Sequence, residues 1–229
     1  MSVEGGPDIV TDGLVLHLDA ANNRSFVSGS TTWFDLSGLG NNAVLTNGPT
    51  YTGSNNGAIV FDGSNDYAPL ATSASFPLGT SPGTVSAWVW IPAGFDPVGS
   101  YKWIFNYGTH SGLQMRALGI AGGKFTFDGY GNRVNSDIDW YPSNGTVWYN
   151  VVGTFSASLV SLYVNGRLSG GPSSFAWNTV GSASQVARNS VGSEFWPGRI
   201  NQVMIYNKAL SAKEVRQNYH ATKGRYGLF

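Results

Sequence analysis

The sequence predicts an all-β protein organised as one domain. Charged residues make up 11% of its 229 residues, against about 25% in a typical globular chain. Glycine contributes 31 residues and aromatic residues 14%, a composition that favours many turns between packed strands and argues against disorder, which is poor in aromatics. Strand-like segments also recur along the chain with turn residues between them. A β-sandwich of about 200–250 residues is commonly one domain.

The first half of the chain contains the strongest strand signal. Strands are expected over residues 14–19, 58–61 and 67–70, the last two separated by turn residues 62–66. Over residues 84–91 the period of two places Ser86, Trp88 and Trp90 on one face and Val85, Ala87, Val89 and Ile91 on the other. Both faces are partly apolar, which is typical of a central strand in a sandwich.

The second half alternates strands with one long polar segment. Further strands are expected over residues 102–107, 113–120, 124–127, 148–155, 159–164 and 199–206. Asn165-Gly166 predicts a tight hairpin, because a type I′ turn needs positive φ at both central positions. Residues 128–147 read as a long loop, and loops of this length inside a compact domain are often functional.

One helix is predicted near the C-terminus. Ser211 and Glu214 have the spacing of a capping box, in which the serine caps free amides and the glutamate reaches back. Residues 208–229 carry five basic side chains against Glu214. This excess indicates either a solvated helix face or an arm that docks on an acidic neighbour. The aromatic and apolar residues 226–229 are expected to fasten the segment to the domain.

The charge and hydropathy patterns limit the classes of function. Net charge is zero and the pI is near 6.8, which argues against nucleic-acid binding. No apolar run approaches about 18 residues, so no transmembrane helix is predicted. The first seven residues lack the basic and apolar parts of a secretory signal. Residues 1–100 hold eight carboxylates and one arginine, so the halves either interleave in space or the acidic half surrounds a cation.

A set of motifs resembles the laminin-G-like branch of the concanavalin A-like superfamily. In chain order they are Thr31-Thr32-Trp33-Phe34-Asp35-Leu36-Ser37-Gly38 with Gly40-Asn41-Asn42, Val60-Phe61-Asp62-Gly63-Ser64-Asn65-Asp66-Tyr67, Val85-Ser86-Ala87-Trp88-Val89, Trp148-Tyr149-Asn150-Val151-Val152, Leu162-Tyr163-Val164-Asn165-Gly166, and residues 198–207 followed by Ala209-Leu210-Ser211. The resemblance implies a two-sheet antiparallel jelly-roll sandwich with a short C-terminal helix. We expect one domain over residues 13–229, preceded by an N-terminal arm over 1–12.

The two ends of the domain narrow this resemblance. Residues 13–22 and 221–228 resemble the versions of this domain found in virion proteins of tailed bacteriophages. That implies a virion surface protein, in capsid decoration or in a tail or fibre, assembled in the host cytoplasm. Its expected partners are other virion proteins or copies of itself, and a host-surface glycan. A purely structural virion subunit without a ligand is the alternative.

Catalysis is not predicted. Glycan hydrolysis needs two carboxylates about 5–10 Å apart, and the sequence offers only three glutamates, none paired with another acid. Asp137 and Asp139 have i, i+2 spacing and would share a face if their segment were extended. Their neighbours read as loop. A glucanase or lyase that uses these two aspartates is therefore the rival interpretation.

The resemblance implies a structural calcium ion. Calcium takes six to eight oxygen ligands, and relatives place them in N-terminal loops and on a late strand. The matching positions are Asp19, Asp35 and Asn201, with Asp62 as a further candidate. Relatives commonly have aspartate at the position of Asn201, so the neutral side chain would weaken the site. The alternative is that these aspartates accept hydrogen bonds from turn amides.

The long loop contains the candidate glycan site. Sugars stack on exposed aromatic rings, and polar side chains beside the rings bind the hydroxyls. Aromatic and polar side chains of both kinds gather here outside the clear strands. The candidates are Tyr130, Arg133, Asn135, Asp139, Trp140 and Tyr141. Alternatively, the loop folds down on its own aromatics or is buried against a neighbouring subunit.

Overall fold

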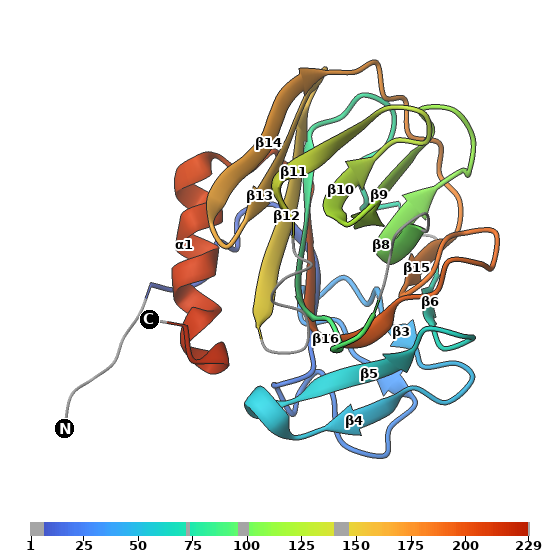
Figure 1. Cartoon of the computed structure of the whole chain (residues 1–229), viewed down its shortest axis with the longest axis vertical. Helices are drawn as coiled ribbons and strands as arrows, with labels where there is room; N and C mark the ends of the chain where they lie inside the picture. The colour runs from blue at the N-terminus through green and yellow to red at the C-terminus, as the bar shows by residue number, and fades with distance from the viewer. Residues whose placement is uncertain (1–6, 72–73, 96–100, 140–146, 229) are drawn as a thin grey trace.

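The chain folds as a two-layer antiparallel β-sandwich with one C-terminal helix (Figure 1). The structure is a computed structural model, and it describes residues 7–71, 74–95, 101–139 and 147–228. Each sheet has eight strands. The prediction of an all-β jelly-roll sandwich with a short C-terminal helix is confirmed.

The strands of the first sheet, sheet A, lie in the order β14-β13-β12-β7-β16-β5-β4, and β1 pairs with β16 beside β5. Their bounds are β1 Leu14–Asp19, β4 Thr50–Thr52, β5 Ala58–Asp62, β7 Gly83–Trp90, β12 Trp148–Ser156, β13 Leu159–Val164, β14 Arg167–Ser174 and β16 Pro197–Tyr206. A 3-10 turn, η1 (Ser54–Asn56), joins β4 to β5.

The strands of the second sheet, sheet B, lie in the order β11-β10-β9-β8-β15-β6-β3-β2. Their bounds are β2 Thr32–Trp33, β3 Ala43–Val44, β6 Ala68–Leu70, β8 Tyr101–Gly108, β9 Met115–Ala121, β10 Lys124–Asp128, β11 Arg133–Asp139 and β15 Ser184–Val186. At one side of the sandwich β11 of sheet B lies beside β14 of sheet A.

The main core lies between the two sheets. The alternation predicted over residues 84–91 is confirmed: Val85, Ala87 and Val89 of β7 enter the core between the sheets, and Trp88 belongs to a separate cluster on the outer face. The predicted hairpin is also confirmed, since Asn165 and Gly166 have φ of 50° and 74° between β13 and β14. Long-range packing of alternate residues therefore forms the core.

The helix α1 (Ala212–Thr222) and the 3-10 turn η3 (Lys223–Tyr226) lie on the outer face of sheet A. The predicted capping box is present: Ser211 Oγ accepts from the amide of Glu214, and the Glu214 carboxylate accepts from the amide of Ser211. Val215 of the helix packs on Val152 and Met204 of the sheet. Trp88 stacks between Tyr219 and Tyr226 and donates from Nε1 to Thr222 Oγ1 at 2.8 Å.

The prediction of a loop over residues 128–147 is wrong for part of that range. Residues 133–139 form β11, which pairs with β10 in sheet B. Val134 enters the core and Ser136 is buried, while the amide of Phe125 donates to Ser136 Oγ. The Asn, Ser and Asp residues of this segment have low strand propensity, and pairing with β10 outweighs it.

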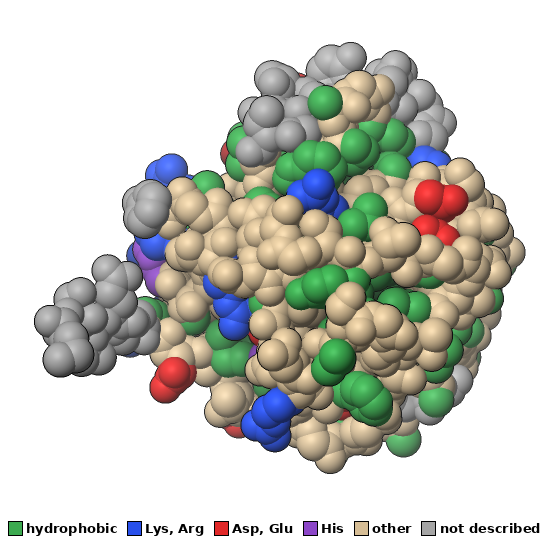
Figure 2. All heavy atoms as spheres, turned by 90° about the horizontal axis from the view of Figure 1, so that it is seen from below, with side chains coloured by type: hydrophobic (Ala, Val, Ile, Leu, Met, Phe, Trp, Pro, Cys, Tyr) green, Lys and Arg blue, Asp and Glu red, His purple; other side chains and the backbone are tan. Residues whose placement is uncertain are grey.

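The surface reflects the low content of charged residues. Figure 2 shows one face of the molecule, where acidic and basic side chains are scattered among hydrophobic and uncharged ones. Among the described residues no helix is both long and apolar enough to span a membrane.

Replacing Glu214 by Gln is expected to lower stability by about 1 kcal/mol at neutral pH, because a cap is weakened. The Glu214 carboxylate accepts hydrogen bonds from Lys208 Nζ and from the amide and hydroxyl of Ser211, each at 2.8 Å. These bonds lower the pKa of Glu214 from 4.5 to about 2. A depressed folded-state pKa stabilises the fold above 4.5, and this contribution is lost as the pH falls toward about 2. Urea denaturation of both proteins across this range measures the difference, and a difference that does not shrink with acid contradicts this role.

Candidate functional site

The outer face of sheet B collects aromatic, acidic and basic side chains above a strand of small residues. Cross-strand pairing places Tyr101, Ala121, Lys124 and Asp139 in one row, Trp103, Gly119, Thr126 and Asn135 in the next, and Asn106, Ala117, Asp128 and Arg133 in a third. On β9 these outward positions are Ala117, Gly119 and Ala121. Side chains from β8 and from β11 can therefore meet above β9.

Two aromatic rings of β8 lie flat over this strand. Tyr101 and Trp103 stack with ring centroids 5.9 Å apart and an interplanar angle of 8°. A Cβ atom at Gly119 would lie only 2.7 Å from Trp103 Cε3, so any larger residue at this position would collide with the indole. From β11, Arg133 Nη1 donates to the Tyr101 hydroxyl at 2.9 Å, and its guanidinium lies 4.9 Å from the centre of that ring.

Two carboxylates lie beneath these side chains. Asp128 is 3% exposed and its Oδ2 lies 3.2 Å from Arg133 Nε. Glu194 Oε2 accepts from Trp103 Nε1 at 2.6 Å and from Asn189 Nδ2 at 2.8 Å. Burial raises the pKa of Asp128; the charge of Glu194 raises it further, while Arg133 and His110 lower it. Asp128 is thus held by Arg133, and Glu194 by Trp103 and Asn189.

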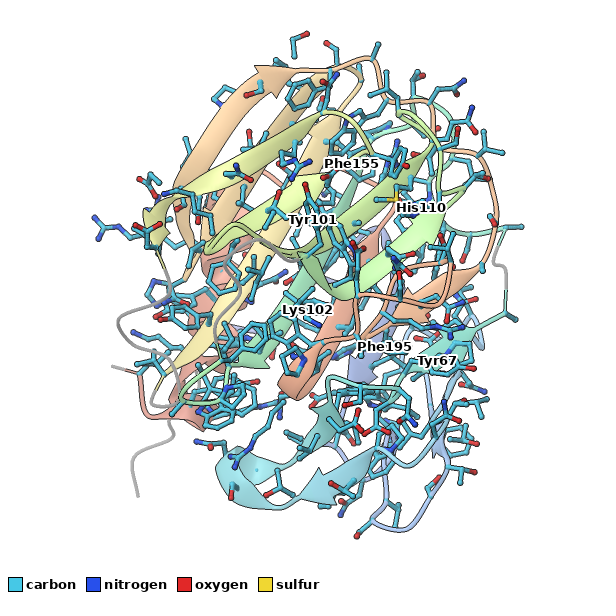
Figure 3. The ribbon with its side chains drawn as sticks, turned by 45° about the vertical axis from the view of Figure 1, so that its right-hand side comes forward. Tyr67, Tyr101, Lys102, His110, Phe155 and Phe195 are labelled. Carbon is cyan, nitrogen blue, oxygen red and sulfur yellow. The ribbon has the colours of Figure 1, made fainter. Side chains whose placement is uncertain are left out.

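An exposed ring lies at the end of the β10–β11 hairpin. Tyr130 is 44% exposed, and its ring centroid is 4.4 Å from that of His110. Its amide donates to Asp128 Oδ1, which fixes the turn at the left-handed φ of 62°. Figure 3 shows Tyr101 and His110 on the same side of the molecule. We call the set Tyr101, Trp103, His110, Asp128, Tyr130 and Arg133 the sheet B patch.

The predicted glycan residues are only partly placed by the structure. Tyr130 and Arg133 belong to the sheet B patch, Asn135 is exposed on β11, and Asp139 pairs with Lys124 at 3.0 Å. Trp140 and Tyr141 lie outside the described residues. Sequence reasoning missed Tyr101, Trp103, His110, Asp128 and Glu194. The i, i+2 spacing of Tyr101 and Trp103 was the local signal that could have placed both rings on one face. The other residues come to this face only through strand pairing and the β15–β16 connection.

Asp137 and Asp139, the acid pair of the predicted glucanase or lyase, contact different strands. Asp139 pairs with Lys124 of β10, whereas Asp137 accepts a hydrogen bond from Ser169 Oγ of β14. The register of β10 and β11 shifts between these positions. The i, i+2 spacing therefore does not place both carboxylates at one point.

The predicted calcium ligands have protein partners in the structure. Asp35 accepts from the amides of His17, Ser37 and Asn41. Asp62 accepts from three amides of its own turn, at Ser64, Asn65 and Asp66.

Asp19 and Asn201 are joined by the C-terminal segment. Arg225 Nη1 lies 2.7 Å from Asp19 Oδ2, and the Tyr226 hydroxyl donates to Asn201 Oδ1. No group of three or more Asp, Glu or His side chains suited to a metal occurs in the described part of the chain. These contacts do not fit calcium at Asp19, because the guanidinium of Arg225 occupies the carboxylate; calcium binding stays a prediction of the resemblance.

The comparison with protein families identifies the class. The profile of the concanavalin A-like lectin/glucanases superfamily, laminin-G type, matches residues 62–216. This is more than half of the chain, and the protein belongs to this family. A comparison with curated protein sequences found no significant match.

Several solved structures share the fold. The binding domain of a Paraclostridial mosquitocidal protein is 22% identical with a TM-score of 0.66, covering 91% of this chain and 52% of that one. A sialidase of Trypanosoma rangeli is 19% identical with a TM-score of 0.68, covering 98% and 36%. Domain 4 of the extracellular arabinanase AbnA from Geobacillus stearothermophilus, in complex with arabinotriose, is 19% identical with a TM-score of 0.64, covering 90% and 98%.

These identities establish a common fold. This chain spans about half of the mosquitocidal binding domain and about a third of the sialidase, but nearly all of the arabinanase domain. A lectin-like jelly roll of this kind occurs both as a separate binding domain and inside enzymes.

Replacing Arg225 by Gln is expected to cost about 3 kcal/mol, because it leaves the buried carboxylate of Asp19 without its cation. Asp19 is 1% exposed. Arg24 provides the matched control, since it is exposed and its change to Gln should alter stability by less than about 0.5 kcal/mol. Denaturant unfolding measures both, and equal losses would contradict the role of the pair.

The wild-type protein used for the unfolding measurement also serves to test the prediction of a bound calcium ion. An ion bound only to the folded state raises stability by mass action. A lower melting temperature of the wild type in chelator supports the calcium prediction, and an unchanged one contradicts it.

Proposed function

We propose that this protein is a non-catalytic, lectin-like domain that binds a glycan through the sheet B patch. The observation that carries the proposal is the meeting of Tyr101, Tyr130 and Arg133 on one face. Aromatic rings supply apolar area at a small entropic cost, and sugar C–H faces pack against them. Arg133, Asn135 and Asp139 supply donors and acceptors for hydroxyl groups beside the rings.

The packing below the rings supports this function. Asp128 forms an ion pair with Arg133, and Arg133 donates a hydrogen bond to the Tyr101 hydroxyl. The absence of a side chain at Gly119 leaves room for the indole of Trp103. Side chains that are already ordered lose little freedom when a ligand binds, which favours affinity. The arabinanase domain solved with arabinotriose has the same fold and makes a neutral oligosaccharide a reasonable first probe.

Replacing Tyr101 by Ala is expected to weaken glycan binding at least about tenfold, because buried aromatic contacts dominate binding sites. Arg133→Gln should weaken it as well, since it removes a donor and releases the Tyr101 hydroxyl. Leu159→Ala is the matched control, because Leu159 is 51% exposed on β13 in the other sheet. Titration calorimetry with arabinotriose and with host polysaccharide measures all four proteins. The proposal fails if the wild type binds none of these glycans, or if the control loses as much as Tyr101→Ala.

A glycan-degrading enzyme is the second candidate, now with a different acid pair. Asp128 belongs to the sheet B patch, Glu194 accepts a hydrogen bond from Trp103 of that patch, and burial raises the pKa of Asp128. Glycoside hydrolysis usually uses two carboxyl groups, one of which acts as the acid. Release of reducing ends from the bound glycan, abolished in Glu194→Gln with binding retained, would establish this function; no release from a glycan that binds contradicts it.

We further propose that the domain works on a bacteriophage particle and that its glycan lies on the host surface. The support is the likeness of residues 13–22 and 221–228 to phage virion proteins. The partners would be other virion proteins or further copies of this chain. Gold-labelled antibody on purified particles tests this setting: label over the head favours capsid decoration, label on the tail favours adhesion, and unlabelled particles contradict the proposal.

A further inference from the structure

A second surface feature lies away from the sheet B patch, between the helix and the β13–β14 hairpin. It is a groove of about 1140 Å³. One wall is helix α1 with η3, and the other is the hairpin, with the end of β11 beside it. The lining residues that matter here are Asp137, Arg167, Ser169, Arg216, Tyr219 and Lys223. None of them belongs to the sheet B patch.

The wall contributed by the helix is a single stripe. Ala212, Arg216, Tyr219 and Lys223 are spaced by three or four residues, so they project from one side of α1 and η3. The buried residues Val215, Asn218 and Thr222 lie on a different side, which packs on sheet A. Of the groove stripe, Tyr219 also packs on sheet A, through its ring contact with Trp88, whereas Ala212 and Arg216 are exposed.

The charge of the groove is unbalanced. Arg167, Arg216 and Lys223 line it, and in the described part of the chain none of them pairs with a carboxylate. The Lys223 ammonium has a ring contact instead, at 5.9 Å from the Tyr219 centroid. Asp137 is the one carboxylate among the lining residues, and it accepts a hydrogen bond from Ser169 Oγ. Three permanent cations facing one carboxylate favour an anionic ligand.

The remaining lining residues suit a saccharide. Tyr219 supplies a ring, and the exposed side chains of Leu168 and Ile138 supply apolar surface. Tyr219 is held firmly, since its ring stacks on Trp88 and packs against Gly166, where a Cβ atom would lie 3.1 Å from the ring. Ser169 and Asn165 add polar groups. A groove of this size accommodates a few sugar units rather than a folded partner.

We propose that this groove is a second binding site, specific for an acidic oligosaccharide with carboxylate or sulfate groups. Arg167 and Arg216 would bind the anionic groups from the two walls, because guanidinium forks match carboxylate and sulfate oxygens. Lys223 would add a further positive charge. The site is independent of the sheet B patch, so one chain would hold a glycan at two places.

Calorimetry with three probes tests the proposal: a heparin oligosaccharide, an oligogalacturonate and a neutral maltooligosaccharide. We expect the wild type to bind at least one acidic probe in a salt-sensitive manner, since exposed charges are screened by salt. The double variant Arg167→Gln/Arg216→Gln should lose at least about tenfold in that affinity. Asp137→Asn should gain affinity, because it removes the opposing charge, and a gain cannot come from misfolding.

Lys213→Gln is the matched control. Lys213 lies on the same helix but not among the groove residues, so its loss should change affinity less than about twofold. A loss in this control equal to that of the double variant would show unspecific attraction to the basic helix and would overturn the proposal. Absence of binding by both acidic probes would also overturn it. Tyr101→Ala should leave acidic binding unchanged, which separates this site from the sheet B patch.

Discussion

The stack of Trp88 between Tyr219 and Tyr226 is the interaction on which the arrangement of both surfaces depends. The Trp88 ring centroid lies 5.7 Å from that of Tyr219 and 3.9 Å from that of Tyr226, and the indole N–H donates a hydrogen bond to Thr222 Oγ1. Trp88 stands on the central strand β7 and faces outward, so sheet A would expose a large apolar surface without the C-terminal segment. Covering that face leaves two surfaces for the proposed ligands, the outer face of sheet B and the groove between the helix and the β13–β14 hairpin.

The same segment contacts two of the residues for which the family resemblance implied calcium ligation. Arg225 brings a positive charge to the buried carboxylate of Asp19, and Tyr226 binds Asn201. A guanidinium beside a buried carboxylate offsets the free-energy cost of an unpaired buried charge. A bound metal cation would have the same effect. The Asp19–Arg225 pair joins the acidic first half of the chain to its basic second half, and the exposed Asp12 pairs with Lys208 at the surface.

The surface of sheet B is shaped by the residues of β9 that lack bulk. Because Ala117, Gly119 and Ala121 leave space, rings from β8 and the guanidinium of Arg133 from β11 meet above that strand. Asp128 and Glu194 then fix these groups from below. The groove lies between the helix and the β13–β14 hairpin with the end of β11 beside it, and none of its lining residues belongs to the sheet B patch.

Local signals in the sequence determined the alternation of β7, the Asn165-Gly166 hairpin and the capping box at Ser211, since each depends on residues that are neighbours in the chain. They also determined the fold class. Strand β11 was not predicted from local sequence, because its Asn, Ser and Asp residues form a strand only through pairing with β10. The contacts of Trp103 with Glu194 and of Asp19 with Arg225 were decided by tertiary structure alone. Contacts between residues so far apart depend on strand order and register, which local spacing does not specify.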